Sequence, residues 1–543
     1  MERLFRFAER GESIGLIWAA MSEPLPMSAV AVEPSTVLML DYEKALELTA
    51  QSPELRSHWN QKLAGSIRSH LIGDSKISDT SIVVVFHQSE QTRPLTKRLI
   101  NRLSKAGETL GIFSDNEVHN YDDCTKVRSL YNNERLISEG EIHEQIGGWG
   151  NPARIIVDLK ATIDDDVASR LIGLSQHILW VADESNWQEA IQRLRELEAD
   201  SPAVRDKVAF IWNLRSGPTA PFAPEIASVA QRDIKTPADD SSSATNTLDP
   251  GVEGVIHHLR GISVGLALGG GAALGMAHLG VLRALEQAGV VVDRIAGTSA
   301  GAMVGLLCAA GHSPDYLVDR FTEDLQPGWL FRMLPRGGYW YLTYKYRRGK
   351  FDPMLRKYLN DLCIEQLPVP ASAVTVDLVS GDVIVRNVGD AVHGILDSIN
   401  LPLLSKPILR DGQALIDGGC VNNVPADVLV SQGCNLVIAV DVLAKIDKEF
   451  AGLRPDTPVS QGKPPNSVQT LLRAYAVQSY NMNSVGSLPA DVRIEPDTSG
   501  FSMSEFTSAS ELASIGEQAT REKLSTIQAL LKRLGSTPHL DPV

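Results

Sequence analysis

The stretch IAGTSAGAMVG, residues 295–305, places one serine among six alanines and glycines. It directly follows an apolar run, GVVVD, that predicts a strand. Small neighbours let the backbone turn abruptly between a strand and a helix, which lifts a serine oxygen above the edge of a sheet. The pentad from Gly297 to Gly301 is therefore consistent with a nucleophile elbow at Ser299, and equally with a tight turn in which Ser299 is an ordinary helix cap.

A glycine-rich loop precedes this pentad. ISVGLAL predicts a buried strand, GGGAALG a loop, and MAHLGVLRALEQAG a helix. This order places backbone N–H groups at a helix N-terminus, where they form an anion site. The anion could be a cofactor pyrophosphate, with Asp293 as the acidic residue of a dinucleotide fold. It could also be the oxyanion of an acyl-transfer intermediate, held by the N–H groups of Gly270, Gly271 and Ala272.

A third motif lies in ALIDGGCVNNVPADVLV, where Asp417 ends an apolar run and two glycines follow it. Gly418 and Gly419 allow a close approach of the backbone, so the pattern predicts a carboxylate at the end of a strand. A serine oxygen needs a base before it can act as a nucleophile. This carboxylate is a candidate for that base.

Histidine is the usual base, and the sequence offers few candidates. His539 is the only histidine after Asp417, and it lies near the C-terminus without a strand around it. His312 and His393 lie between the serine and the aspartate without an obvious orienting acid beside them. Direct action of Asp417 on Ser299 is the simplest arrangement.

The three motifs, in this order, resemble the patatin-like phospholipase family. The resemblance implies a three-layer α/β domain over residues 260–445 and a serine-dependent lipid acyl ester hydrolase of the phospholipase or lysophospholipase type. The residues that it implies are the Ser299–Asp417 dyad, the oxyanion loop residues Gly269, Gly270, Gly271, Ala272 and Gly275, and the supporting glycines Gly297, Gly301, Gly418 and Gly419.

One residue departs from the family pattern. The family's oxyanion loop usually carries an arginine or lysine just before its last glycine, and this chain has Leu274 there. Loss of the cation is expected to lower the rate or to shift preference towards less anionic esters. The alternative function is a catalytically impaired lipid-binding or regulatory module. The reaction needs no metal, and no ligand cluster suggests one, so no cofactor is expected.

The rest of the chain predicts further domains of α/β class. Residues 80–215 alternate apolar strands with helices, which predicts a second α/β domain with a parallel sheet. Its first turn, HQSEQTRPLT, has neither the glycines nor the lysine of a phosphate-binding loop. Residues 230–258 are polar and rich in Ser, Thr, Asp and Pro, which predicts a linker. Residues 446–543 predict a C-terminal helical region.

Residues 1–72 resemble the C-terminal half of a cyclic-nucleotide-binding domain. The stretch that would hold the ligand phosphate is PLPMSAV, which lacks an arginine. Cyclic nucleotide binding is therefore not expected. The domain order is similar to that of neuropathy target esterase and its bacterial relatives.

Charge and composition bear on partners and location. The formal net charge of −15 argues against a general nucleic-acid binder. The five cysteines lack metal-ligand spacing, and the first residues lack the apolar region of a secretory signal. These features predict a cytoplasmic protein, and residues 327–351 extend the prediction to a peripheral position at the inner membrane surface.

Residues 327–351, PGWLFRMLPRGGYWYLTYKYRRGKF, contain eight aromatic residues, six Lys or Arg and no acidic residue. Aromatic rings favour the membrane interface, and cations favour anionic lipid. The stretch therefore predicts a face that delivers a lipid substrate to the site. The alternative is a cap over the pocket, with its aromatic rings buried and its cations solvated.

Overall fold

The computed structural model describes residues 80–535, apart from 116–125, 133–134, 137–138, 151, 201–203, 239–248, 335–336, 403, 444–449, 451–464, 466 and 504–505, together with residues 41, 44, 45 and 47. The chain divides into two compact units, residues 1–79 and 80–543. The segment that resembles a cyclic-nucleotide-binding domain thus lies outside the described residues, apart from four positions. No described helix has the length and apolarity needed to cross a membrane.

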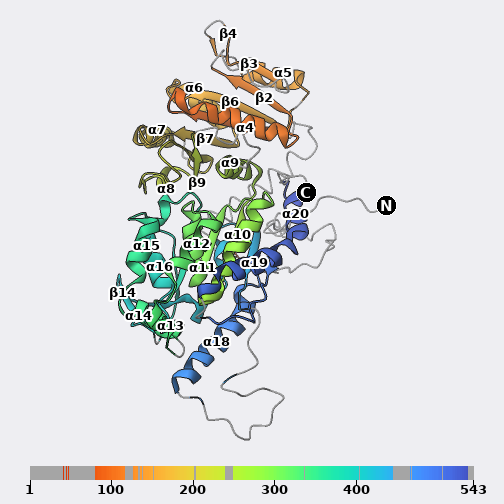
Figure 1. Ribbon diagram of the computed structural model, residues 1–543. Helices are drawn as coiled ribbons and strands as arrows, with labels where there is room; N and C mark the ends of the chain where they lie inside the picture. The colour runs from red at the N-terminus through yellow and green to blue at the C-terminus, as the bar shows by residue number, and fades with distance from the viewer. Residues whose placement is uncertain are drawn as a thin grey trace. The chain divides into compact units, whose positions relative to one another are not determined.

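A seven-stranded sheet of parallel strands, in the order β3-β2-β6-β1-β7-β8-β9, organises the first part of the larger unit (Figure 1). Its strands are β1 (Ser81–His87), β2 (Leu110–Ser114), β3 (Lys126–Ser129), β6 (Arg154–Lys160), β7 (His177–Ala182), β8 (Val208–Leu214) and β9 (Arg232–Pro237). Its helices are α4 (Pro94–Lys105), α5 (Glu139–Gly148), α6 (Asp165–Leu174), α7 (Trp187–Asp200), α8 (Ile226–Val229) and α9 (Pro250–Arg260), and β4 (Tyr131–Asn132) pairs with β5 (Arg135–Leu136).

The strands of this sheet are apolar because both of its faces are covered. All seven residues of β8 are buried. One face packs against α4 and α9, and the other packs against α5, α6, α7 and α8. A parallel sheet covered on both faces requires such continuous apolar runs. The α/β fold predicted for this part of the chain is confirmed.

The turn after β1 is closed by buried charge pairs. The Arg93 guanidinium contacts the Asp158 carboxylate at 2.9 Å and the Asp115 carboxylate at 2.6 Å. Arg93 is 2% exposed, so protein carboxylates satisfy this cation inside the fold.

The linker predicted over residues 230–258 is wrong at both ends. Residues 232–237 form β9, and residues 250–260 form α9, whose apolar face packs on the sheet beside α4. Arg102 of α4 pairs with Glu253 of α9, so charge as well as packing joins these helices. Only residues 239–248 of the expected linker lie outside the described residues.

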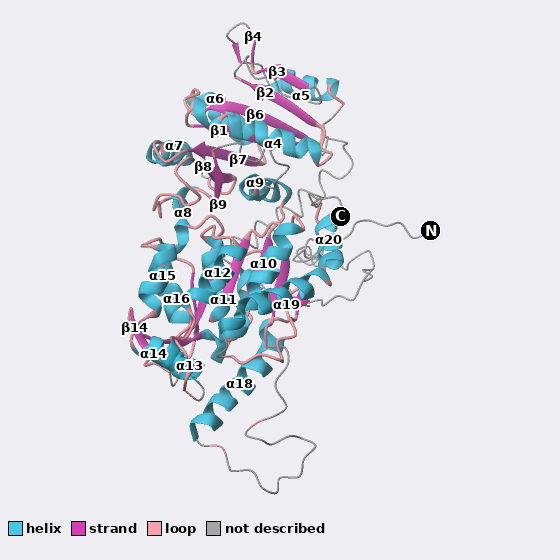
Figure 2. Ribbon diagram, in the orientation of Figure 1, coloured by secondary structure: helices cyan, strands magenta, loops and turns pink. Residues whose placement is uncertain are grey.

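A second, eight-stranded sheet follows, in the order β14-β15-β12-β11-β10-β16-β17, with β13 paired to β12 (Figure 2). Its strands are β10 (Val264–Leu268), β11 (Arg294–Thr298), β12 (Ala371–Asp377), β13 (Val383–Arg386), β14 (Ile408–Arg410), β15 (Gln413–Asp417), β16 (Leu436–Val440) and β17 (Val492–Ile494). Its helices are α10 (Ala277–Gln287), α11 (Ala300–Ala309), α12 (Pro314–Asp324), α13 (Trp329–Arg332), α14 (Gly337–Arg347), α15 (Phe351–Leu359), α16 (Ala391–Ser398), α17 (Ala426–Ser431), α18 (Ser467–Gly486), α19 (Ala509–Arg521) and α20 (Leu524–Arg533).

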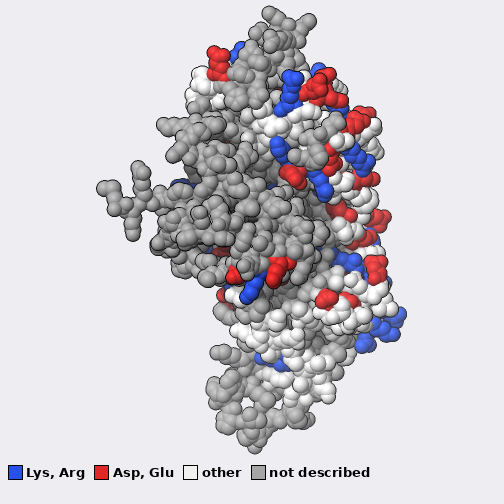
Figure 3. Space-filling view, turned by 180° about the vertical axis from the view of Figure 1, so that it is seen from behind, with Lys and Arg blue, Asp and Glu red and all other residues white. Residues whose placement is uncertain are grey.

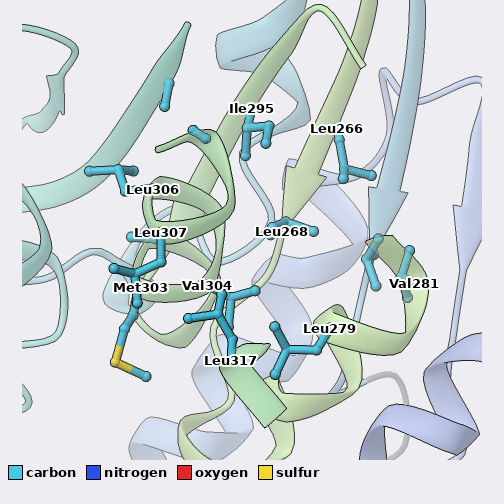
Figure 4. Packing of buried hydrophobic residues seen from close by; sticks show 14 of the residues in the cluster. Leu266, Leu268, Leu279, Val281, Ile295, Met303, Val304, Leu306, Leu307 and Leu317 are labelled. Carbon is cyan, nitrogen blue, oxygen red and sulfur yellow. The ribbon is translucent and has the colours of Figure 1, made fainter. Parts of the chain in front are cut away.

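Helices cover both faces of the second sheet, as predicted for a three-layer domain. On one face, side chains from β10, β11 and α11 meet in one core, shown for Leu266, Ile295 and Leu306 in Figure 4. On the other face, α17 packs over the small residues Ala267 and Ala296. The parallel strands β10, β11, β12 and β16 direct their carboxyl ends to one edge, where the loops of interest begin.

The C-terminal region packs on this domain and contributes a strand as well as helices. Strand β17 pairs with β16 and extends the sheet. Helix α19 packs against α10 at glycines: a Cβ added to Gly280 would lie 1.6 Å from the Ala513 carbonyl oxygen, and one added to Gly516 would lie 1.9 Å from that of Ala277. The helices therefore touch backbone to backbone.

His278 of α10 holds the loop that follows β10. Its ring is buried, and its Nε2 lies 2.7 Å from the Gly269 carbonyl oxygen, to which it donates in the neutral form. Burial lowers the pKa of His278 to about 4. The ring is therefore neutral at physiological pH and acts as a structural donor.

We predict that Gly280→Ala lowers the free energy of unfolding of the domain built on the eight-stranded sheet, called the second domain below, by about 2 to 3 kcal/mol. The new methyl group would force α19 away from α10. Thermal unfolding followed by circular dichroism measures this change. The matched control is Gly173→Ala in α6, where an added Cβ meets nothing within 4 Å. It should be neutral or stabilise by up to about 1 kcal/mol, and equal effects of the two changes would contradict the contact.

We also predict that acid weakens the second domain through His278. The folded pKa of about 4 lies below the ordinary histidine pKa of 6.5, so the unfolded chain binds more protons between these values. The free energy of unfolding therefore falls as pH drops from 6.5 to 4, by about 3 kcal/mol. His278→Gln keeps a donor but does not titrate. Urea unfolding at pH 7 and pH 4 should show a smaller loss in this variant, and identical losses would refute the prediction.

Candidate active site

Ser299 lies at a strained turn between β11 and α11. Its φ is 54° and its ψ is −120°, a conformation that non-glycine residues rarely adopt. The turn requires glycine on both sides of the serine. A Cβ on Gly301 would lie 2.0 Å from the Leu268 carbonyl oxygen, and one on Gly297 would lie 2.4 Å from the Gly301 carbonyl. The strand is Arg294–Thr298, so the run GVVVD precedes it instead of forming it.

A hydrogen-bonded serine fixes this turn. The Ser299 N–H donates to Ser398 Oγ at 2.8 Å, and Ser398 Oγ donates to the Val374 carbonyl oxygen at 2.6 Å. Ser398 is fully buried at the end of α16. The elbow is thus tied to the middle of β12.

Asp417 reaches the same edge of the sheet from the other side of β12. The register pairs Thr298 with Val374, and Thr375 with Asp417. After Asp417 the chain passes close to the middle of β12 and to the end of β11, because a Cβ on Gly418 would lie 2.4 Å from the Val374 carbonyl oxygen and 3.1 Å from Thr298 Cγ2. Asp417 is 1% exposed and accepts a hydrogen bond from the Gly419 N–H at 2.8 Å. Non-local strand pairing therefore places Thr298, which precedes the serine, and Asp417 at adjacent positions on the two sides of β12.

The glycine-rich loop lies against the elbow. A Cβ on Gly270 would lie 3.1 Å from Ser299 Cβ, and one on Gly275 would lie 2.4 Å from Ala300 Cβ. Ala272 adopts a φ of 50°, so two of the positive-φ non-glycine residues in the described chain face the same site. Glycine at 270 and 275 is required for this close approach.

The loop's amide groups differ from the expected set of donors. The Gly270 N–H donates to the Asn423 carbonyl oxygen at 3.1 Å, and the Ala273 N–H donates to that of Met503 at 3.0 Å. Gly270 therefore cannot offer its N–H to an oxyanion, contrary to the sequence-based expectation. Within the described residues, the N–H groups of Gly271 and Ala272 are left as the loop's candidate donors.

Leu274 and Asp293 occupy structural positions. Leu274 is 5% exposed and packs in the hydrophobic core. The position at which the family usually has an arginine or lysine is therefore filled by a buried apolar side chain. Asp293 precedes β11 and accepts from the Val264 N–H at 2.7 Å, at the amino edge of the sheet. The glycine loop follows the carboxyl end of β10, which is the opposite edge. Asp293 cannot serve a cofactor in that loop, and this removes the support for a dinucleotide site.

The two intervening histidines are held by structural partners. His312 Nε2 lies 3.0 Å from the Tyr358 carbonyl oxygen, and His393 Nδ1 lies 2.8 Å from Arg410. Neither lines the pocket beside Ser299. This agrees with the expectation that both are polar or core histidines.

Ser299 lines a small apolar pocket that is open to solvent. Its walls come from separate parts of the second domain, which places one hydroxyl among hydrocarbon and aromatic side chains. The lining residues are Ala272, Ser299, Ala300, Met303, Tyr346, Phe351, Ile399, Leu401 and Phe506. Such a pocket suits an acyl chain.

Several residues of the pocket and of the turn at Ser299 could not be singled out in the sequence. Phe506 comes from the C-terminal region, for which no function was expected, and Ser398 stands in an unremarkable helix. Tyr346 lies in the aromatic segment, the one available signal. Burial and the charge of Asp417 raise the pKa of the Tyr346 phenol, which therefore stays protonated beside the site.

The segment 327–351 has an inner and an outer side. Lys345 is 6% exposed, and its Nζ donates to the Asp324 carbonyl oxygen at 2.6 Å. Burial lowers the pKa of Lys345 to about 8. The expectation of a surface cation is wrong for Lys345, which helps to fix α14 in place. By contrast, Trp329 is 65% exposed and Met333 is 75% exposed.

Comparison with known proteins agrees with the site. Residues 266–430 match the family model described as patatin-like phospholipase. An uncharacterised NTE family protein of Mycobacterium tuberculosis is 30% identical over 298 residues, 52% of this chain and 50% of that protein. Lysophospholipase NTE1 of Kluyveromyces lactis is 30% identical over 294 residues, 50% of this chain and 20% of that protein.

Patatin-like phospholipase domain-containing protein 6 of Homo sapiens is 36% identical over 193 residues, 34% of this chain and 14% of that protein. The chain spans half the length of the mycobacterial relative and less of the other two. The family match, over residues 266–430, covers the part of the chain that carries the three motifs. Residues 266–430 therefore form a patatin-like phospholipase domain, and the chain is related to the neuropathy target esterase family.

Proposed function

We propose that the chain is a serine-dependent lipid acyl ester hydrolase of the phospholipase or lysophospholipase type. The observation that carries the proposal is the position of Ser299: a strained, small-sided turn opens it to an apolar pocket, and Asp417 reaches the same sheet edge. Apolar walls beside this hydroxyl suit the acyl chain of an ester whose carbonyl group lies at Ser299. No cofactor is needed for this reaction.

The reaction proceeds in two steps. Asp417 accepts the Ser299 proton, and Ser299 Oγ attacks the ester carbonyl. The N–H groups of Gly271 and Ala272, with that of Ala300 at the start of α11, stabilise the oxyanion. Asp417 returns the proton to the leaving oxygen as the intermediate collapses, which releases the alcohol. Asp417 then accepts a proton from water, whose oxygen attacks the acyl-enzyme, and return of that proton to Ser299 Oγ releases the fatty acid. Each donor is worth on the order of 3 kcal/mol in the transition state.

The proposal predicts the behaviour of two variants. Ser299→Ala should abolish hydrolysis of a nitrophenyl ester and of a lysophospholipid, because no nucleophile is left. Asp417→Asn should lower kcat by roughly 10²- to 10⁴-fold, because the amide cannot accept the proton. The matched control is Asp352→Asn, a half-buried carboxylate that follows Phe351 and does not line the pocket, which should keep native activity. Full activity of Ser299→Ala would refute the mechanism. An inactive native chain that still binds lipid would favour the alternative lipid-binding or regulatory module.

We further propose that the outer side of segment 327–351 contacts an anionic membrane. Exposed apolar residues lie there beside exposed Arg347 and Arg348, and the segment has no acidic residue. By contrast, Figure 3 shows acidic and basic side chains interspersed over the described part of one face. Tyr346 and Phe351 of the same segment line the pocket, so contact with lipid would bring substrate to Ser299.

This contact predicts a charge-dependent affinity for vesicles. Arg347→Glu with Arg348→Glu should weaken binding to phosphatidylglycerol-containing vesicles by roughly 30-fold or more, at about 1 kcal/mol for each lost cation. Lys523→Glu with Lys532→Glu is the control, because it changes the net charge equally at exposed positions of the C-terminal region. Vesicle sedimentation measures both, and equal binding of the two double variants would remove the membrane proposal.

A further inference from the structure

A buried chain of amides connects the end of β16 to the glycine-rich loop. Asn423 clamps Gly270: its carbonyl oxygen accepts the Gly270 N–H at 3.1 Å, and its Nδ2 donates to the Gly270 carbonyl oxygen at 3.3 Å. A Cβ on Gly270 would lie 2.5 Å from Asn423 Oδ1, so the contact is close on every side. Gly270 immediately precedes the two candidate oxyanion donors.

Asn423 is in turn held from α18. Its Nδ2 also donates to Asn483 Oδ1 at 2.9 Å, and Asn483 Nδ2 donates to Asp441 Oδ1 at 2.7 Å. Asn423 and Asn483 are each 2% exposed, and Asp441 is 8% exposed. Asp441 Oδ1 also accepts the Leu443 N–H at 2.9 Å, beyond the end of β16. Each side chain in this row of hydrogen bonds has a partner, which favours a single arrangement of the loop.

The position of Asn483 makes this connection informative. It lies in α18, outside the part of the chain that matches the patatin-like family model. A hydrophobic residue would fill the space at least as well, yet the chain places there a side chain that both accepts and donates. Among the described residues, its amide links the Asp441 carboxylate to the Asn423 amide, which needs an acceptor at that point.

We infer that Asn483 is a positioning residue for the hydrolase reaction, which sets the oxyanion loop through Asn423 and Gly270. The inference rests on the proposed function, since it concerns the same loop. Asn483 touches neither substrate nor Ser299. It acts by holding Gly271 and Ala272 where their N–H groups can meet the developing oxyanion, and small displacements of such donors are costly.

Kinetics of an ester substrate test the inference. Asn483→Leu should lower kcat on the order of 10- to 100-fold and leave KM within about 2-fold, because the loop acts on the transition state rather than on acyl binding. The matched control is Gln478→Ala, which removes another contact of α18, from Gln478 Nε2 to the Cys420 carbonyl oxygen. It should keep the native kcat. Native kcat in Asn483→Leu would overturn the inference.

Asn483→Asp separates a hydrogen-bonding role from a packing role. A protonated carboxyl group at this position can accept from Asn423 and donate to Asp441, whereas two carboxylates repel one another and raise the pKa of the pair. The ratio of variant to native kcat should therefore fall as pH rises from 5 to 8. Glu495 and Arg493 also act on Asp441, but they are common to both proteins and cancel in the ratio. A ratio that is independent of pH would overturn the inference.

Hydrogen exchange distinguishes failure of this inference from failure of the proposed function. Amides of residues 269–276 should exchange faster in Asn483→Leu than in the native chain or in Gln478→Ala. If the native chain hydrolyses no ester but exchange increases as expected, the network stands and the proposed function fails. If the native chain is active and neither exchange nor kcat changes, the inference fails and the proposed function stands.

Discussion

The close approach of the glycine-rich loop to the start of α11 is the contact on which the rest of the site depends. Gly275 meets Ala300, and Gly301 meets the Leu268 carbonyl oxygen, each at a distance that excludes a larger side chain, and Gly270 packs tightly against Ser299. The strained Ser299 conformation, worth roughly 1–3 kcal/mol, persists because packing on all sides leaves no alternative. The sequence around the serine is therefore rich in glycine and alanine because larger side chains would not fit there.

The remaining parts of the site are supported from long range. The β12 strand separates the serine strand from the aspartate strand, so the register of β11, β12 and β15 decides whether the two side chains can meet. The C-terminal region contributes Phe506 to the pocket, the Met503 carbonyl oxygen to the loop, and α18 to its amide network. The site therefore needs more of the chain than the segment that carries its motifs.

Local patterns predicted much of this structure because their physical causes are local. The strand, loop and helix around residues 264–287 follow from an apolar run, three successive glycines and helical spacing, and all three are present. The Asp417–Gly418–Gly419 turn follows from the same kind of pattern. The linker was mispredicted because polar composition around residues 239–248 hid the short strand and helix that flank it.

Other features could not be predicted because their causes lie far along the chain. The Gly270 N–H is taken by a carbonyl group at residue 423, and no pattern near Gly270 reveals that partner. Lys345 has the same sequence surroundings as Arg347, but helix geometry buries one and exposes the other. The contribution of Asn483 depends on where α18 docks, which tertiary packing alone decides.

The central claim is that the fold activates Ser299 as a nucleophile, and covalent labelling tests it most directly. The native chain would be treated with a fluorophosphonate, digested, and its peptides identified by mass spectrometry. The account predicts one adduct, on Ser299, that is absent from chain unfolded before treatment. An absence of adduct under conditions that label an active patatin-like hydrolase, or an adduct on another serine, would contradict it.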